Sequence, residues 1–160
     1  MAKKRQEYSD EFKWNIKDLY ASETDFLKDF NYLEKNKSEF LKYKNHVLDN
    51  ADTLLELLEK DNEYNKKLEQ VYIYAHIQND QDTNDSKLQT LYGKVYKLYL
   101  NYQEITSFIV PEILKSDYQI INDYINENKK LKKYERVLKE IFKLKKYILS
   151  DKEEKILSMM

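Results

Sequence analysis

Cysteine is absent from this 160-residue sequence, and glycine and proline occur only once each. Without cysteine there can be no disulfide framework, thiolate metal site or cysteine nucleophile, which fits a reducing compartment such as the cytoplasm. Hairpins and multi-stranded sheets usually need glycine and proline at their turns, so their scarcity argues against a β fold. No apolar run approaches the roughly 18 residues of a membrane span, and the opening residues lack the apolar core of a secretion signal. The sequence therefore predicts neither secretion nor membrane insertion.

What the sequence has in abundance is charge and aromatic residues: 36% of its residues are charged, 41% are hydrophobic and 14% are aromatic. This balance is typical of amphipathic helices around a modest core, in a chain whose length suits one domain. Apolar residues recur near the 3.6-residue period along much of the chain. We expect an all-α fold, an antiparallel helical bundle or array of about six helices.

Capping residues mark where the first predicted helices begin. Ser22, with Asp25 three residues later, predicts a helix that runs into the mid-forties, after an irregular leader over residues 1–21. Asn50 or Asp52 opens the next helix, which the polar stretch 59–63 separates from a third helix. The third helix ends at the polar residues 79–85.

The fourth predicted helix has the most regular pattern, because its apolar residues alternate steps of three and four. They are Leu88, Leu91, Val95, Leu98, Tyr102, Ile105 and Ile109. Pro111 interrupts this pattern and predicts a boundary or kink near Val110. A short helix capped by Ser116 or Asp117 follows, and after residues 126–130 a last helix carries the apolar residues Tyr134, Val137, Leu138, Ile141, Phe142 and Ile148.

The last residues suggest a further helix. Ser150 and Glu153 have the spacing of a capping box, and apolar residues follow from Ile156 to Met160. We therefore divide the chain into the leader 1–21, a helical domain over 22–149, and the start of a helix over 150–160 that belongs to a missing downstream part.

Neither histidine predicts a metal site, because His46 and His76 lie far apart and neither has a second ligand one helical turn away. The acidic cluster over residues 80–85 lacks the glycine and the final glutamate of a calcium loop, so we interpret Asn84 and Asp85 as a helix N-cap. We find no candidate catalytic or metal-ligating residue.

Two surfaces are candidate binding sites. Tyr92, Tyr96 and Tyr99 share one helix face and could contact a substrate, although burial against a core edge is the interpretation we favour. Residues 129–147 hold nine basic and two acidic side chains, and five of the basic residues fall on one face: Lys132, Arg136, Lys139, Lys143 and Lys146. This face could bind phosphates or an anionic surface, but a solvated face or docking on acidic protein is favoured, so nucleic acid is an unlikely partner.

Several segments, taken in order, resemble the oligoendopeptidase F family of thimet oligopeptidase-like zinc metallopeptidases. They are Lys13 to Ser22 (KWNIKDLYAS), Leu68 to His76 (LEQVYIYAH), Phe108 to Leu114 (FIVPEIL) and Tyr134 to Leu138 (YERVL). The resemblance covers nearly the whole chain and identifies it as the N-terminal region of such an enzyme.

The resemblance implies a parent enzyme of the cytoplasm that cleaves short peptides with zinc held by a His-Glu-x-x-His helix, a motif that these 160 residues lack. It implies a non-catalytic domain that forms part of the substrate-channel wall, with the catalytic domain and an oligopeptide as partners. The chain alone is then expected to be inactive and to bind no zinc. The alternative is a stand-alone helical module that binds nucleic acid, an anionic surface or an acidic protein through the basic helix 129–147.

Overall fold

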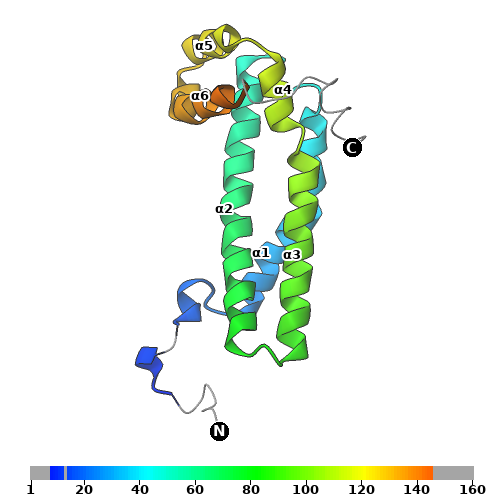
Figure 1. The fold of residues 1–160 in the computed structure, drawn as a ribbon, viewed down its shortest axis with the longest axis vertical. Coiled ribbons are helices and arrows are strands. Elements are labelled where there is room, and N and C mark those ends of the chain that lie inside the picture. Colours follow the sequence, from blue (N-terminus) through cyan, green and yellow to red (C-terminus); the bar gives the residue numbers. More distant parts are fainter. Residues whose placement is uncertain (1–7, 13, 146–160) are drawn as a thin grey trace, which may run out of the picture. The chain divides into compact units, whose positions relative to one another are not determined.

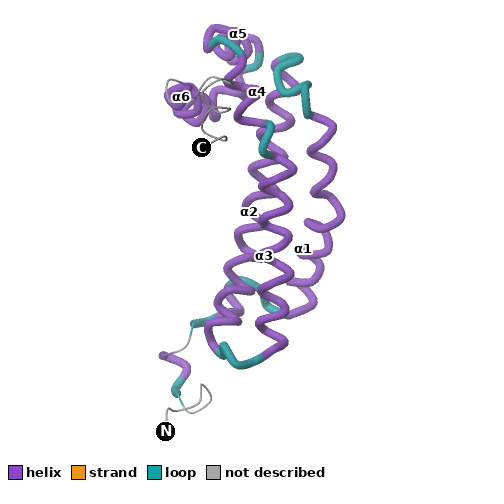
Figure 2. The backbone as a smooth tube through the Cα atoms, turned by 45° about the vertical axis from the view of Figure 1, so that its right-hand side comes forward, coloured by secondary structure: helices purple, strands orange, loops and turns teal. Residues whose placement is uncertain are grey.

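The computed structural model describes residues 8–12 and 14–145, and within these ranges it contains helices and no β-strand (Figures 1 and 2). The α-helices are α1 (Glu23–Asn36), α2 (Ala51–Gln81), α3 (Ser86–Thr106), α4 (Ile109–Lys115), α5 (Tyr118–Glu127) and α6 (Glu135–Leu144). Short 3-10 segments cover Asp10–Phe12, Ile16–Asp18, Lys37–Tyr43 and Lys129–Tyr134. The all-α prediction is confirmed. The predicted helix start at Ser150 lies outside the described residues.

The predicted N-cap of the first helix is confirmed, but its predicted length is wrong. Ser22 Oγ accepts a hydrogen bond from the backbone N–H of Asp25 at 3.2 Å. The α-helix ends at Asn36 and the chain continues as a 3-10 helix over Lys37–Tyr43. Because a 3-10 helix has three residues per turn, the 3.6-residue stripe fails there: Phe40 is buried, whereas Leu41 is 49% exposed.

The predicted break over residues 59–63 does not exist, because α2 runs continuously over 31 residues. Asn50 does cap this helix, since its Oδ1 accepts from the N–H of Thr53 at 2.8 Å. The stretch 59–63 is polar but contains no glycine or proline, and its Glu and Lys residues are good helix formers. One polar side chain of this stretch also makes a tertiary contact, because Asp61 accepts a hydrogen bond from Tyr102 on α3.

The chain forms two compact units, which we describe separately. The first contains residues up to Leu41 and the segment Glu59–Thr106, so it comprises α1, most of α2, and α3. These helices run side by side (Figures 1 and 2). The buried apolar side chains of this unit are Tyr20, Phe26, Leu33, Phe40, Tyr64, Leu68, Val71, Tyr74, Ala75, Val95, Leu98 and Tyr102.

A ring cluster connects the three helices of the first unit. Tyr64 on α2 stacks on Tyr102 on α3, with ring centroids 4.0 Å apart and planes at 17°, and Phe40 contacts both rings edge-on. Both hydroxyls are satisfied: Tyr64 donates to the carbonyl of Leu33 at 2.8 Å, and Tyr102 donates to Asp61 Oδ1 at 2.6 Å. The cluster therefore joins apolar packing to buried hydrogen bonds.

The predicted boundary near Val110 falls slightly earlier. α3 ends at Thr106, and α4 begins at Ile109, so Ile109 belongs to α4 and not to the α3 seam. Pro111 lies in the first turn of α4, where a helix has no partner for the missing N–H.

The second unit contains residues Lys42–Leu58, with the start of α2, and the segment from Ser107, with α4, α5 and α6. Long-range hydrogen bonds connect its segments: Tyr124 donates to the carbonyl of Leu48 at 2.6 Å, and Asn128 Nδ2 donates to Asp52 Oδ1 at 2.7 Å. The last predicted helix begins later than expected, at Glu135, because Lys129–Tyr134 is 3-10. Val137, predicted to be apolar-facing, is 52% exposed, whereas Leu138 is buried.

We predict that Tyr102→Phe lowers the free energy of unfolding by about 1–3 kcal/mol, because it removes the hydrogen bond that the Tyr102 hydroxyl donates to the partly buried carboxylate of Asp61. Tyr96→Phe is the matched control, since Tyr96 is 43% exposed, and its effect should stay within about 0.5 kcal/mol. Urea unfolding followed by circular dichroism measures both. Equal effects of the two substitutions would contradict this account.

We also predict a loss of stability at high pH. Burial raises the pKa of Tyr20, Tyr64 and Tyr102 above the ordinary value of 10.0. A nearby carboxylate raises each pKa further: Asp29 for Tyr20, Glu34 for Tyr64 and Asp61 for Tyr102. A raised pKa in the folded chain gives stability that is fully present below pH 10 and is lost as pH rises further. Each of these tyrosines contributes at most about 1.4 kcal/mol to the loss of unfolding free energy per pH unit.

Urea unfolding at several pH values between 9 and 12 tests this expectation. Tyr64→Phe should reduce the slope of stability against pH, and the exposed Tyr96→Phe should not. A slope that is the same in all three proteins would assign the alkaline instability to other groups.

Candidate functional site

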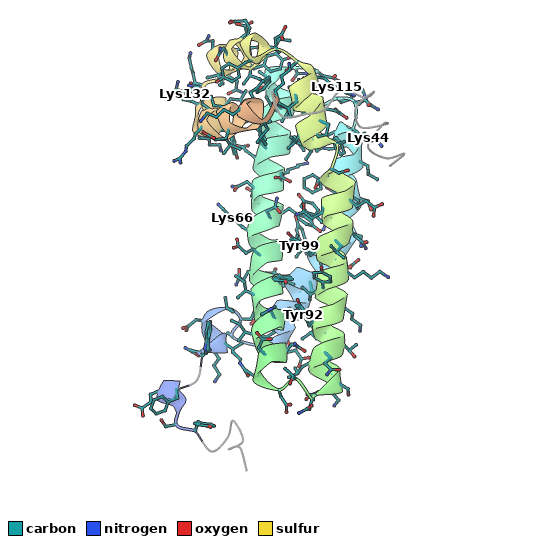
Figure 3. All side chains as sticks on the ribbon, in the orientation of Figure 1. Lys44, Lys66, Tyr92, Tyr99, Lys115 and Lys132 are labelled. Carbon is teal, nitrogen blue, oxygen red and sulfur yellow. The ribbon has the colours of Figure 1, made fainter. Side chains whose placement is uncertain are left out.

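The three tyrosines singled out from the sequence lie on α3, and each is partly accessible. Tyr96 is 43% exposed, Tyr99 is 37% exposed, and Tyr92 is half-buried. Tyr92 and Tyr96 stack on each other with centroids 6.1 Å apart. Figure 3 shows Tyr92 and Tyr99 in the space between α2 and α3. These rings are therefore neither a fully buried core edge nor freely projecting side chains.

Two residues of α2 complete an aromatic cluster with them. The ring of Tyr72 lies 5.9 Å from that of Tyr92 and 5.6 Å from that of Tyr99, and the hydroxyls of Tyr72 and Tyr92 are hydrogen-bonded at 3.1 Å. His76 meets the Tyr92 ring edge-on at 5.3 Å, and its Nδ1 lies 3.1 Å from Asp80 Oδ2. Sequence reasoning placed His76 outside any site, although its position four residues after Tyr72 puts both on one face of a helix.

The hydrogen bond between the two hydroxyls changes the acidity of Tyr72. Its pKa is raised above 10.0, first because of the hydrogen bond with Tyr92 and then because of partial burial. The pair also fixes the orientation of the Tyr72 ring relative to α3.

Beside this cluster lies a groove of about 400 Å³ between α2 and α3, which we call the α2/α3 groove. It is lined by Asn65, Leu68, Glu69, Tyr72, Tyr99 and Gln103. Of the predicted tyrosines only Tyr99 lines it. The α2 side was missed from the sequence, although positions 65, 68, 69 and 72 follow the helical period and so share a face. A partly apolar groove with amide and carboxylate groups is suited to binding a peptide segment.

The basic residues singled out from the sequence make several ion pairs with their own segment. Lys132 and Lys139 both pair with Glu135, at 2.7 and 3.0 Å, and Lys143 pairs with Glu140 at 2.6 Å. Hydrogen bonds from these lysines lower the pKa of both glutamates. Lys132 lies in the 3-10 segment (Figure 3), Arg136 is exposed, and Lys146 is outside the described residues. Anion binding by this face stays a prediction.

Within residues 8–12 and 14–145, no three histidine, aspartate or glutamate side chains lie close enough together to hold a metal ion. His46 and His76 each pair with an aspartate of their own segment. Asp85 caps α3, as predicted, since its Oδ1 accepts from the N–H of Lys87 at 2.7 Å. None of the described helices is both long and apolar enough to span a membrane.

Comparison with known proteins relates this helical chain to peptidases. A family model described as Oligopeptidase F matches residues 112–160. The oligoendopeptidase F homolog of Lactococcus lactis strain IL1403 is 34% identical over 99% of this chain, and oligopeptidase PepF of Bacillus subtilis strain 168 is 34% identical over 96%. The crystal structure of oligoendopeptidase-F from Enterococcus faecium matches 85% of the chain with a TM-score of 0.74 and 29% identity.

The chain spans only about a quarter of these proteins: 26% of the Lactococcus protein, 23% of the Bacillus protein and 27% of the Enterococcus chain. It therefore corresponds to the N-terminal region of oligoendopeptidase F, and the resemblance seen in the sequence motifs is confirmed.

We predict that Tyr92→Phe moves the pKa of Tyr72 down toward 10, because it removes the hydroxyl whose hydrogen bond is the main cause of the raised pKa. Titration of ¹³C-labelled tyrosine rings by NMR measures this shift directly. Tyr96→Phe is the control, since Tyr96 stacks on Tyr92 but shows no hydrogen bond to Tyr72 in the described structure. An unchanged Tyr72 titration in Tyr92→Phe would contradict the assigned cause.

Proposed function

We propose that this chain is the N-terminal, non-catalytic helical domain of a zinc-dependent oligoendopeptidase that cleaves short peptides. The observation that carries the proposal is similarity along nearly the whole chain to oligoendopeptidase F proteins of which it spans about a quarter. The 160 residues contain no His-Glu-x-x-His motif, and the described residues do not fit a zinc site. Its main partner is then the catalytic domain of its own polypeptide, and the enzyme acts in the cytoplasm.

In this proposal, the chain forms part of the substrate-binding surface of the enzyme and supplies no catalytic group. Zinc in the catalytic part would polarise the scissile carbonyl of the peptide. The role of the present residues is to form part of the wall of the substrate channel. The face formed by α2 and α3 supports this role, because Tyr72, Tyr96 and Tyr99 offer aromatic surface beside the amide side chains of Asn65 and Gln103. Aromatic and amide groups together suit peptides of varied sequence.

The wall also needs to hold its shape when peptides of different sequence contact it. The rings of Tyr64 and Tyr102 join α2 to α3 and pack with Phe40, which lies in the 3-10 segment after α1. Their hydroxyls are engaged in hydrogen bonds with Leu33 and Asp61, so the helices are held in register as well as in contact. A rigid, largely preformed surface reduces the ordering that binding requires.

The decisive test of identity is the coding sequence after the Met160 codon. The proposal expects an open frame that later encodes His-Glu-x-x-His, together with a further zinc-ligating glutamate. A stop codon directly after Met160, with no catalytic part encoded nearby, would refute it.

We predict that the purified 160-residue chain hydrolyses no internally quenched fluorescent peptide, with or without added Zn²⁺. The whole polypeptide should cleave the same peptide and lose this activity on treatment with a chelator, because the zinc ligands lie outside the present residues. A mock purification from cells that lack the gene is the control for contaminating peptidases. Chelator-sensitive cleavage that co-purifies with the folded 160-residue chain would contradict the prediction.

A further inference from the structure

The α2/α3 groove has a chemical character that its role as a channel wall does not require. It combines two aromatic rings from different helices with one carboxylate, from Glu69. The rings of Tyr72 and Tyr99 lie 5.6 Å apart at 42°, so they form an angled corner and not a closed stack. The faces of aromatic rings carry negative potential and attract cations, arginine most often. The corner thus favours a planar cation.

The carboxylate adds a full negative charge next to this corner. Glu69 lies one helical turn before Tyr72, on the same face of α2. Its side chain is exposed, and no described lysine or arginine forms an ion pair with it. Of the neighbouring lysines, Lys67 pairs with Asp29 at 2.7 Å, and Lys66 projects from the outer side of α2, whereas Tyr99 lies between the two helices (Figure 3). With respect to the residues that the structure describes, the charge is therefore available to a ligand.

The far end of the groove offers groups that suit a peptide backbone. Gln103 is exposed and makes no hydrogen bond in the described structure, so its amide can both donate and accept. Asn65 donates through Nδ2 to the carbonyl of Asp61 at 2.9 Å, which leaves its Oδ1 as an acceptor. The groove is open and about 400 Å³ in volume, which is within the range of ligand sites.

We propose that the α2/α3 groove is a subsite for the arginine side chain of a peptide. The guanidinium lies in the corner between Tyr72 and Tyr99 and pairs with Glu69, and the adjoining peptide groups contact Gln103 and Asn65. Arginine fits better than lysine because its planar guanidinium stacks on a ring face while its N–H groups still reach a carboxylate. The hydrogen bond between the hydroxyls of Tyr72 and Tyr92 holds the Tyr72 ring in place before the ligand arrives. As a statement about substrate, this subsite rests on the proposed function.

The test is direct binding to the 160-residue chain, which needs no catalytic activity. The probe is a blocked pentapeptide with a central arginine between alanines, and its partner is the same peptide with citrulline, which keeps the shape and removes the charge. Titrations followed by NMR of labelled tyrosine rings and side-chain amides should show shifts at Tyr72, Tyr99 and Gln103. We expect the citrulline peptide to bind about five- to tenfold more weakly.

Matched variants isolate the charge. Glu69→Gln keeps the size of the side chain and should weaken binding of the arginine peptide about two- to fivefold, with no change for the citrulline peptide. Glu63→Gln, an exposed glutamate of the same helix outside the groove, is the control and should leave both affinities unchanged. Raising the salt concentration should weaken binding of the arginine peptide to the chain with Glu69, and should leave binding of the citrulline peptide and binding to Glu69→Gln unchanged.

Equal affinities for the two peptides, or equal effects of the two glutamate variants, would overturn the subsite. An absence of shifts at Tyr72, Tyr99 and Gln103 would overturn it as well. The coding sequence after Met160 decides the proposed function independently. The arginine subsite can therefore be refuted while the proposed peptidase function is confirmed. Equally, the groove can bind arginine even if the coding sequence shows that the protein is not a peptidase.

Discussion

The contact between Tyr64 and Tyr102 is the interaction on which the first unit depends. Their rings stack at 4.0 Å between α2 and α3, and Phe40, after α1, packs edge-on against both. Each hydroxyl also has a defined partner, in the carbonyl of Leu33 and the carboxylate of Asp61. Aromatic packing alone would allow the helices to slide, whereas these buried hydrogen bonds are satisfied in only one register. The positions of Tyr72 and Tyr99, and hence the geometry of the α2/α3 groove, follow from that register.

The tyrosines of α2 and α3 fall into two groups, one buried in the core and one exposed to solvent. On the inner side, Tyr64 and Tyr102 are almost fully buried and carry strongly raised pKa values because burial disfavours the phenolate. On the outer side, Tyr96 and Tyr99 remain open to solvent and leave ring surface for a ligand. Tyr72 lies between these extremes, held by a hydroxyl pair with Tyr92. The two helices thus present an aromatic surface to solvent over a core in which other tyrosines are buried.

The charged segment near the end of the described residues is a different case. Its excess of lysine suggested an anion-binding face, but Glu135 and Glu140 are placed so that Lys132, Lys139 and Lys143 pair with them. These pairs are exposed, so they add little to stability. Their effect is that the glutamates offset part of the positive charge of this segment locally. The groove on α2 and α3 has the opposite property, since the carboxylate of Glu69 has no ion-pair partner among the described residues.

The amino-acid sequence by itself determined the helical class, the N-cap at Ser22 and the relation to oligoendopeptidase F, because composition, capping and motif order are local properties. It narrowed the next N-caps to Asn50 or Asp52 and to Asn84 and Asp85, and the structure shows Asn50 and Asp85 accepting the capping hydrogen bonds. Only the tertiary structure decided that α2 continues through residues 59–63, since a polar stretch looks like a linker until Asp61 is seen to bind Tyr102. It also decided which tyrosines are buried. Spacing along one helix shows that residues share a face, but the groove requires the register between two helices, and that register depends on contacts between residues far apart in the chain.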